Sequence, residues 1–326
     1  MTFARAWCYA LLSATPLLPQ ISEIGAPPGR LVGIDGRKLH VYCTGSGSPS
    51  IILEAGAGSF AIDWSLVQPE IARTNRVCSY DRAGSGWSDP PRVVQFPENP
   101  ATVVLDLHAG LQGAAVKPPY VMVGASIGGI YVRMYESKYP SEVTAIVLVD
   151  PAYEERLFTM FQGKPVTIAS LTADQVGSTV KPGPASIPRR SPQTGAPFDL
   201  LPRELYELRV KLETRLIASI PTTVPHDVVI ASAEGERAAL ARLHETSKTQ
   251  DHPLGDRPLV VLTRGMDWSQ GLQDAHAALA RLSTNSRHTV VADAGHEIHL
   301  YNPAAVVQAI RDVLGAVSHG TRLTAK

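Results

Sequence analysis

Short apolar runs alternate along this chain with stretches in which apolar residues recur at helical spacing. The runs indicate β-strands and cover residues 50–54, 76–80, 120–123, 142–149, 258–263 and 287–292. Helices are predicted between and after them, over residues 64–71, 100–115, 130–139, 271–282 and 303–316. Residues 33–43 form a further predicted hairpin with its turn at Asp35–Gly36. Apolar strands that alternate with helices predict a mainly parallel sheet covered on both faces.

Residues 152–257 interrupt this alternation. Residues 163–197 are rich in Pro, Gly, Ser and Thr, whereas residues 201–220 predict a charged amphipathic helix. A segment of this length between two strands is too long for a loop. We therefore expect a core made of residues 30–151 and 258–318, with residues 152–257 inserted as a partly helical cap.

The N-terminal segment, residues 1–29, is a leader or a signal- or anchor-like segment in this interpretation. Residues 6–18 are mostly apolar and follow Arg5, but they are too few to span a bilayer. No clean small-x-small cleavage site follows them. The segment is interpreted either as a signal peptide or as a helix packed on the domain. The protein is accordingly expected to be either exported or membrane-anchored, or cytoplasmic. Any membrane association is expected only through this segment.

The composition narrows the choice of partners. The chain has 326 residues, 44% hydrophobic and 18% charged, which suits one large globular α/β domain with an insertion. Lys plus Arg and Asp plus Glu are 30 each and no basic block stands out, so no nucleic-acid partner is expected. The sequence has no His/Cys cluster at metal-ligand spacing and no glycine-rich phosphate loop. We expect no metal and no cofactor.

The segment Gly124-Ala125-Ser126-Ile127-Gly128-Gly129 directly follows the apolar run 120–123. A Gly-x-Ser-x-Gly turn between a strand and a helix holds the serine hydroxyl clear of the sheet. The small residues are needed because a larger side chain would clash with the strand or the helix. Three fixed positions are a weak signal alone, and the predicted strand before them and helix after them strengthen it. Ser126 is therefore the candidate nucleophile.

Serine needs a base within hydrogen-bond reach. Of the ten histidines, His296 lies in Ala294-Gly295-His296, just past the last predicted strand and at the carboxyl edge of the sheet. His299 lies three residues further on and is expected to be structural. His296 is the candidate base.

Two carboxylates are candidates for the acid that orients the base. Asp267 follows the penultimate strand, nine residues after Pro258, and Asp150 ends the strand before the insertion, 24 residues after Ser126. Both strand ends face the same edge as the serine turn. We favour Asp267 and keep Asp150 as the alternative.

Acyl transfer also needs two backbone N–H groups directed at the developing oxyanion. Ile127, which follows the nucleophile, supplies the first candidate. The glycine-rich turn Ala55–Gly58 supplies the second, at Ala57. The chain order Ser, Asp, His fits this assembly.

These motifs together resemble the α/β-hydrolase superfamily over about residues 30–316. The resemblance rests on these segments: Leu39–Gly45, Ala55–Gly58, Ser79–Asp89, the Ser126 turn and Gly295-His296. It is serine esterase- or lipase-like, and the Tyr80–Asp89 stretch looks like that of esterases, proline iminopeptidases and cofactor-free haloperoxidase-like enzymes. The family implies an α/β-hydrolase fold with a mainly parallel eight-stranded sheet, helices on both faces and a cap.

Some positions depart from the family pattern. Ala55-Gly56 stands where His-Gly is usual, and Gly265-Met266-Asp267 is one residue shorter than the usual Gly-x-x-Asp. Members similar to haloalkane dehalogenases place the acid after the earlier strand, which keeps Asp150 open. A serine at the turn, in place of aspartate, argues against dehalogenase and epoxide hydrolase chemistry.

The three cysteines, Cys8, Cys43 and Cys78, are too few for a disulfide scaffold. Cys43 and Cys78 fall in predicted strands and are interpreted first as buried small apolar residues. In the fold that the resemblance implies, these strands are neighbours, so a disulfide between them is the alternative if the protein is exported.

The sequence thus predicts a serine hydrolase that cleaves a small-molecule carboxylic ester through an acyl-enzyme. Leu157, Phe158 and Phe161 near the start of the insertion are expected to line an apolar pocket, which favours a hydrophobic ester or lactone. The enzymatic alternative is an amidase or aminopeptidase, with an acidic cap residue to hold a substrate ammonium; the candidates are Glu154, Glu155, Glu204 and Glu207. A ligand-binding protein on a hydrolase scaffold, without turnover, is the third interpretation.

Overall fold

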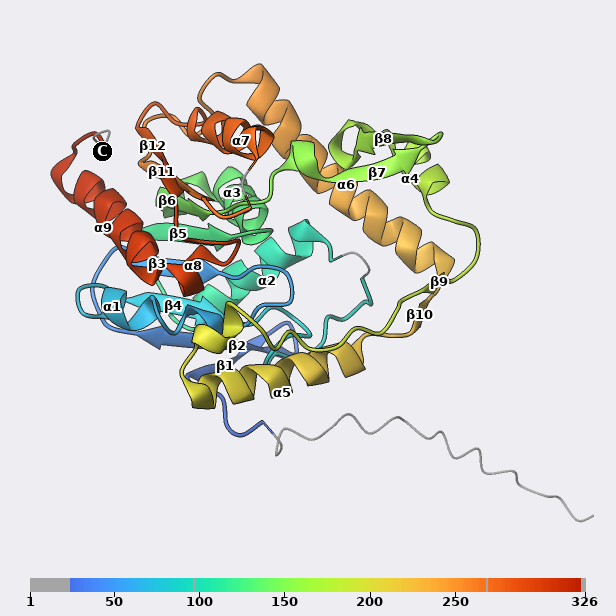
Figure 1. The fold of residues 1–326 in the computed structure, drawn as a ribbon, viewed down its shortest axis with the longest axis horizontal. Coiled ribbons are helices and arrows are strands. Elements are labelled where there is room, and N and C mark those ends of the chain that lie inside the picture. The colour runs from blue at the N-terminus through green and yellow to red at the C-terminus, as the bar shows by residue number, and fades with distance from the viewer. Residues whose placement is uncertain (1–23, 96–97, 268, 324–326) are drawn as a thin grey trace, which may run out of the picture.

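The computed structural model describes residues 24–95, 98–267 and 269–323. Its centre is an eight-stranded sheet in the order β1-β2-β4-β3-β5-β6-β11-β12 (Figure 1). The strands are β1 Arg30–Ile34, β2 Arg37–Thr44, β3 Ser50–Glu54, β4 Val77–Tyr80, β5 Tyr120–Ala125, β6 Val143–Val149, β11 Leu259–Arg264 and β12 Ser286–Val291. Only β2 runs opposite to the other strands of this sheet, so the sheet is mainly parallel, as predicted.

Both faces of the sheet carry an apolar core, which explains the continuous apolar runs. On β5, Tyr120 and Met122 join the core on one face, whereas Val121 and Val123 join the core on the other. The first core packs against α2 Pro100–Gly113, α3 Gly128–Lys138 and α7 Gln270–Ala280. The second packs against α1 Gln68–Ala72 and α9 Pro303–His319 (Figure 1).

The predicted helix 64–71 is replaced by two short elements, the 3₁₀ turn η2 Ala61–Trp64 and α1. Pro69 is the reason, because it lies in the first turn of α1. Proline is tolerated there but not in a helix interior, so no helix can run through it from residue 64.

The insertion, residues 152–257, adds no strand to the central sheet. Its strands form two small antiparallel pairs, β7 Phe158–Phe161 with β8 Lys164–Thr167 and β9 Ala185–Ser186 with β10 Thr223–Val224. Its helices are α4 Ala173–Thr179, α5 Arg203–Ser219 and α6 His226–Thr249, with the 3₁₀ turns η4 Glu154–Arg156, η5 Ile168–Ser170 and η6 Phe198–Leu200. The short elements η3 Pro140–Glu142 and α8 Ile298–Tyr301 belong to the sheet-forming part.

Two apolar contacts tie the long helices of the insertion to the core. Leu240 and Leu243 of α6 pack against Val103 and Ile130 of α2 and α3. On α5, Leu212 packs against Phe60 and Ile62.

A buried arginine reinforces the second contact. Arg209 of α5 is fully buried and pairs with Asp63 of η2 at 3.2 Å and with Glu213 at 2.7 Å. Its guanidinium lies 3.4 Å from the centre of the Phe198 ring. Removing one partner of such a pair would leave a buried charge uncompensated, so this contact fixes where α5 can lie.

Cys43 of β2 and Cys78 of β4 are register partners and form a disulfide. The interpretation as two separate buried thiols is therefore wrong, and the alternative implied by the family resemblance describes the structure. Cys8 and most of the predicted N-terminal segment lie outside the described residues. No helix in the described ranges is long and apolar enough to cross a membrane.

The disulfide predicts that reduction of the unfolded protein releases two further thiols per chain. A double C43A/C78A variant should lose about 2–4 kcal/mol of unfolding free energy, since the bond closes a loop of 35 residues. Thiol titration before and after reduction, with denaturant unfolding of both proteins, measures these quantities. An unchanged thiol count would contradict the pairing.

Candidate active site

Ser126 lies at the apex of the turn between β5 and α3, with a backbone φ of +53°. The glycines around it have no room for a side chain. A Cβ on Gly124 would lie 2.4 Å from the Gly128 oxygen, and one on Gly128 would lie 2.7 Å from the Glu54 oxygen. A Cβ on Gly129 would lie 2.6 Å from Pro151. The glycine spacing in the sequence is therefore a packing requirement of this turn.

His296, in the turn after β12, connects Ser126 to a carboxylate. Its Nε2 lies 2.9 Å from Ser126 Oγ, and its Nδ1 lies 2.5 Å from Asp150 Oδ2. A carboxylate can only accept, so Nδ1–H donates to Asp150, and Nε2 of the neutral ring accepts from the Ser126 hydroxyl. This is the arrangement in which a serine can lose its proton to an oriented imidazole.

The structure places Asp150, and not Asp267, against His296. Asp150 is buried at the end of β6, and its Oδ1 accepts a hydrogen bond from the backbone N–H of Arg264 at 3.0 Å. Asp267 is exposed, and within the described ranges it has no hydrogen bond to His296. The sequence-based preference for Asp267 is therefore wrong.

The path of the chain after β11 explains this outcome. The N–H groups of Gly265 and Met266 both donate to the Ala294 oxygen, at 3.1 and 3.0 Å. A Cβ on Gly265 would lie 2.4 Å from Ala292. The segment is thus bound to the turn that precedes His296, and Asp267 is left at the surface.

The electrostatic surroundings favour a charged imidazolium at His296. The hydrogen bond to Asp150 raises the pKa of His296 above its usual 6.5, against the opposing effect of burial. Arg264 Nη1 lies 3.4 Å from Asp150 Oδ2 and acts to lower the same pKa. His299 is fully buried beside Trp64, and burial lowers its pKa to about 3, which fits the expected structural role.

The candidate oxyanion donors lie on two segments that meet at Ser126. A Cβ on Gly56 would lie 3.3 Å from Ser126 Cβ, so the Ala55–Gly58 turn runs directly beside the nucleophile. Within the part of the chain that the structure describes, neither Ala57 N–H nor Ile127 N–H donates to another protein group. Both are therefore available to a bound substrate atom.

A family model described as the alpha/beta hydrolase fold matches residues 51–303. The chain belongs to the α/β-hydrolase family. Among curated relatives, the uncharacterized protein YqjL of Bacillus subtilis (strain 168) is 26% identical over 86% of this chain and 89% of its own length. The uncharacterized protein YbdG of the same strain is 30% identical, but this match covers only 40% of either chain.

Solved structures agree on the fold of this α/β-hydrolase. A thermophilic esterase from Thermogutta terrifontis has a TM-score of 0.56 and 21% identity, over 88% of this chain and 97% of its own. Est816, described as an N-acyl homoserine lactone degrading enzyme, has a TM-score of 0.55 and 20% identity, over 86% and 99% of the two chains. At these identities the likeness shows the fold alone.

The predicted pocket residues of this α/β-hydrolase lie in different surroundings. Leu157 and Ile127 each pack against the apolar cluster that α2, α3 and α6 form. Phe158 lines a cavity of about 540 Å³ that the insertion forms between β7, α4 and α6. Phe161, on β7, does not line it.

The candidate acidic residues of the insertion are not equivalent. Glu154 is buried and forms a two-pronged ion pair with Arg133, at 2.7 and 2.9 Å. Glu155, Glu204 and Glu207 are exposed. In the described ranges, no group of three or more His, Cys, Asp and Glu side chains could hold a metal ion.

Sequence reasoning missed residues that surround the acid and the oxyanion turn. His276 Nδ1 lies 4.0 Å from Asp150 Oδ1, and its Nε2 donates to the Pro151 oxygen. Arg264 is the last residue of β11 and could have been found from that position. Arg82, which contacts the Ala55–Gly58 turn, lies in the Tyr80–Asp89 stretch that carries the family resemblance, but its contacts are not evident from that stretch, and His276 carries no such signal.

The site geometry predicts that the pKa of His296 lies above 6.5 and falls in D150N. Loss of the carboxylate removes the largest cause of the raised pKa and leaves burial and Arg264, which lower it, against the weaker effect of Glu297, which raises it. The matched variant D267N should leave the pKa unchanged. The imidazole signal of His296 is identified by its absence in H296Q, and NMR titration of that signal measures the pKa in the wild type, D150N and D267N. An equal fall of the pKa in D267N would contradict the geometry.

Proposed function

We propose that this α/β-hydrolase cleaves carboxylic esters through an acyl-enzyme on Ser126. The observation that carries the proposal is the continuous hydrogen-bonded chain from Ser126 Oγ through His296 to Asp150. This chain lies beside a turn and a helix start that supply two unused N–H groups.

The first half of the reaction forms the acyl-enzyme. Ser126 Oγ attacks the ester carbonyl while its proton passes to His296 Nε2. Asp150 stabilises the imidazolium, because it accepts from Nδ1 in a buried position. The carbonyl oxygen becomes an oxyanion that accepts from the N–H groups of Ala57 and Ile127.

The second half releases the acid. His296 returns its proton to the departing alkoxide, and the alcohol leaves. Water then loses a proton to His296 and attacks the acyl carbon, and the collapse of this intermediate restores the Ser126 hydroxyl. Neither half needs a metal or an organic cofactor.

A hydrophobic ester or lactone fits the surroundings best. The apolar cluster against which Leu157 packs also contacts Ile127, next to the nucleophile, and Phe158 lines a cavity formed by the insertion itself. An esterase and a lactone-degrading enzyme among the structural relatives fit this substrate class. The amidase alternative has less support, since the buried Glu154 is already paired with Arg133.

Hydrolysis of a p-nitrophenyl ester series from acetate to palmitate tests the proposal. The wild type should show an optimum chain length, and S126A should lose more than about 10³-fold in kcat because the nucleophile is gone. Circular dichroism of S126A checks that the fold is intact. Equal rates for the two proteins, or no hydrolysis of any ester or lactone by the wild type, would contradict the proposal.

A further inference from the structure

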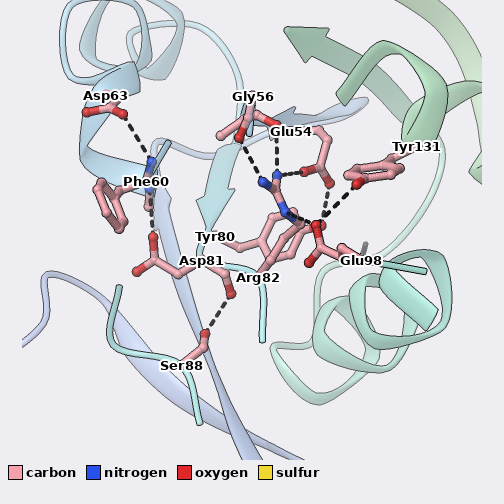
Figure 2. Close-up of polar contacts among 12 residues, drawn as sticks. Glu54, Gly56, Phe60, Asp63, Tyr80, Asp81, Arg82, Ser88, Glu98 and Tyr131 are labelled. Atoms are coloured by element: carbon pink, nitrogen blue, oxygen red, sulfur yellow. Dashed lines mark hydrogen bonds and ion pairs between the residues drawn. The ribbon is translucent and has the colours of Figure 1, made fainter. Parts of the chain in front are cut away.

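Arg82 is a buried arginine that contacts the Ala55–Gly58 turn. Its Nη1 donates to the Ala55 oxygen at 2.8 Å and its Nη2 donates to the Gly56 oxygen at 2.7 Å (Figure 2). Only 8% of the side chain is exposed. One planar guanidinium therefore binds two successive carbonyls of the turn, which a single-point cation such as lysine cannot do.

The bond to the Gly56 oxygen also orients Ala57 N–H, together with the Ser59 N–H, which donates to the same oxygen at 3.3 Å. The Gly56–Ala57 peptide is not among the cis bonds of the structure, so its C=O and N–H are directed to opposite sides. Because the Gly56 oxygen is directed at Arg82, the Ala57 N–H is directed away from Arg82. Ser126 lies against the same turn, 3.3 Å from where a Cβ on Gly56 would be.

The guanidinium is itself fixed by two carboxylates. Nη1 donates to Glu54 Oε1 at 2.8 Å, and Nε donates to Glu98 Oε2 at 3.1 Å (Figure 2). Glu54 is fully buried and also accepts from the Tyr80 hydroxyl. Burial raises the pKa of Glu54 to about 7, and Arg82 acts against that rise. The charge of Arg82 is thus compensated inside the protein, and its three donating nitrogens are all used.

The same cluster reaches the helix that supplies the other oxyanion donor. Glu98 accepts from the Tyr131 hydroxyl at 3.1 Å, and the Arg82 guanidinium carbon lies 5.4 Å from the centre of the Tyr131 ring. Tyr131 belongs to α3, which begins directly after Ile127. Arg82 therefore connects the Ala57 turn to the helix start at Ile127.

We propose that Arg82 is a positioning residue, which orients Ala57 N–H and holds it in register with Ile127 N–H for the tetrahedral intermediate. This inference rests on the proposed function, because it assigns Arg82 to the oxyanion site of that reaction. The oxyanion exists only after attack, so a loss of alignment raises the barrier and leaves ground-state binding almost unchanged.

The test compares R82K with wild type on the best p-nitrophenyl ester. We expect kcat to fall about 10–100-fold with KM within about 2-fold, which is less than the loss of a whole oxyanion donor. An alkyl boronic acid adds to Ser126 and forms a tetrahedral adduct, so its affinity for R82K should fall by about the same factor as kcat. The affinity of R82K for the carboxylic acid product should stay at the wild-type value. The control is R133K, which alters another buried, ion-paired arginine, 4% exposed, and should keep the wild-type kcat.

A second readout separates this inference from the proposed function. Phosphonylation of Ser126 by a p-nitrophenyl phosphonate needs the nucleophile and the oxyanion site but no turnover. If the wild type reacts with neither the p-nitrophenyl ester nor the phosphonate, the proposed function is overturned, and the role of Arg82 with it. A reactive wild type with an equally reactive, folded R82K overturns the role of Arg82 alone, as does an equal loss of kcat in R133K.

If R82K does not fold, E98Q replaces it, since Glu98 is 36% exposed and its substitution removes the negative charge beside Arg82 Nε and the Tyr131 hydroxyl but leaves the Arg82 bonds to the turn. We expect kcat of E98Q to fall about 2–5-fold at constant KM, because only part of the alignment is lost. An unchanged kcat in E98Q would overturn the inference.

Discussion

The backbone of Ser126 is held in a left-handed conformation, and the geometry of the whole site depends on it. Such a φ costs a non-glycine residue about 1–3 kcal/mol and persists only where the surroundings enforce it. Here the Ser126 N–H donates to the Val149 oxygen, and the Ser126 oxygen accepts from Gly129 and Ala152. The strand, the helix and the segment after β6 therefore fix one turn, which presents the hydroxyl to His296.

The parallel sheet brings the other groups to the same place. The carboxyl ends of β3, β5, β6, β11 and β12 meet at one edge, and the oxyanion turn, Ser126, Asp150, Arg264 and the His296 turn follow them. Asp150 also has a positive φ, of 41°, so two strained residues on neighbouring strands face one histidine. The buried Arg82 binds the carbonyls of Ala55 and Gly56 and so holds the turn that is proposed to supply an oxyanion donor. The site is thus preorganised by backbone contacts as much as by side chains.

Features that depend on local periodicity could be predicted from the sequence. The runs that became β5 and β6 face apolar cores on both sides, so their continuous apolar pattern indicated buried strands. The glycines around Ser126 predicted the turn. Each one lies so close to neighbouring atoms of the turn or of an adjoining segment that a side chain would clash. The position of His296 followed from the end of the last strand. Each of these sequence patterns lies within about one strand or helix, along the chain, of the residue whose position it predicts.

Features that depend on contacts between distant segments could not be predicted. Asp150 and Asp267 both follow strands that end at the same edge, and the difference lies in distant contacts: His296 pairs with Asp150, whereas Gly265 and Met266 bind the Ala294 oxygen and Asp267 is exposed. The partners of Arg82 come from three separate segments, at Glu54–Gly56, Glu98 and Tyr131. Within the insertion, the two-residue strands β9 and β10 are too short to leave a pattern.

Covalent labelling tests the central claim, an activated nucleophile at Ser126, most directly. The intact protein would be treated with an alkyl fluorophosphonate, and the modified peptide would be located by mass spectrometry. The account predicts one adduct per chain, on Ser126, which forms much more slowly in H296Q although Ser126 is still present. Labelling at another residue, or labelling of Ser126 at the same rate without His296, would contradict it.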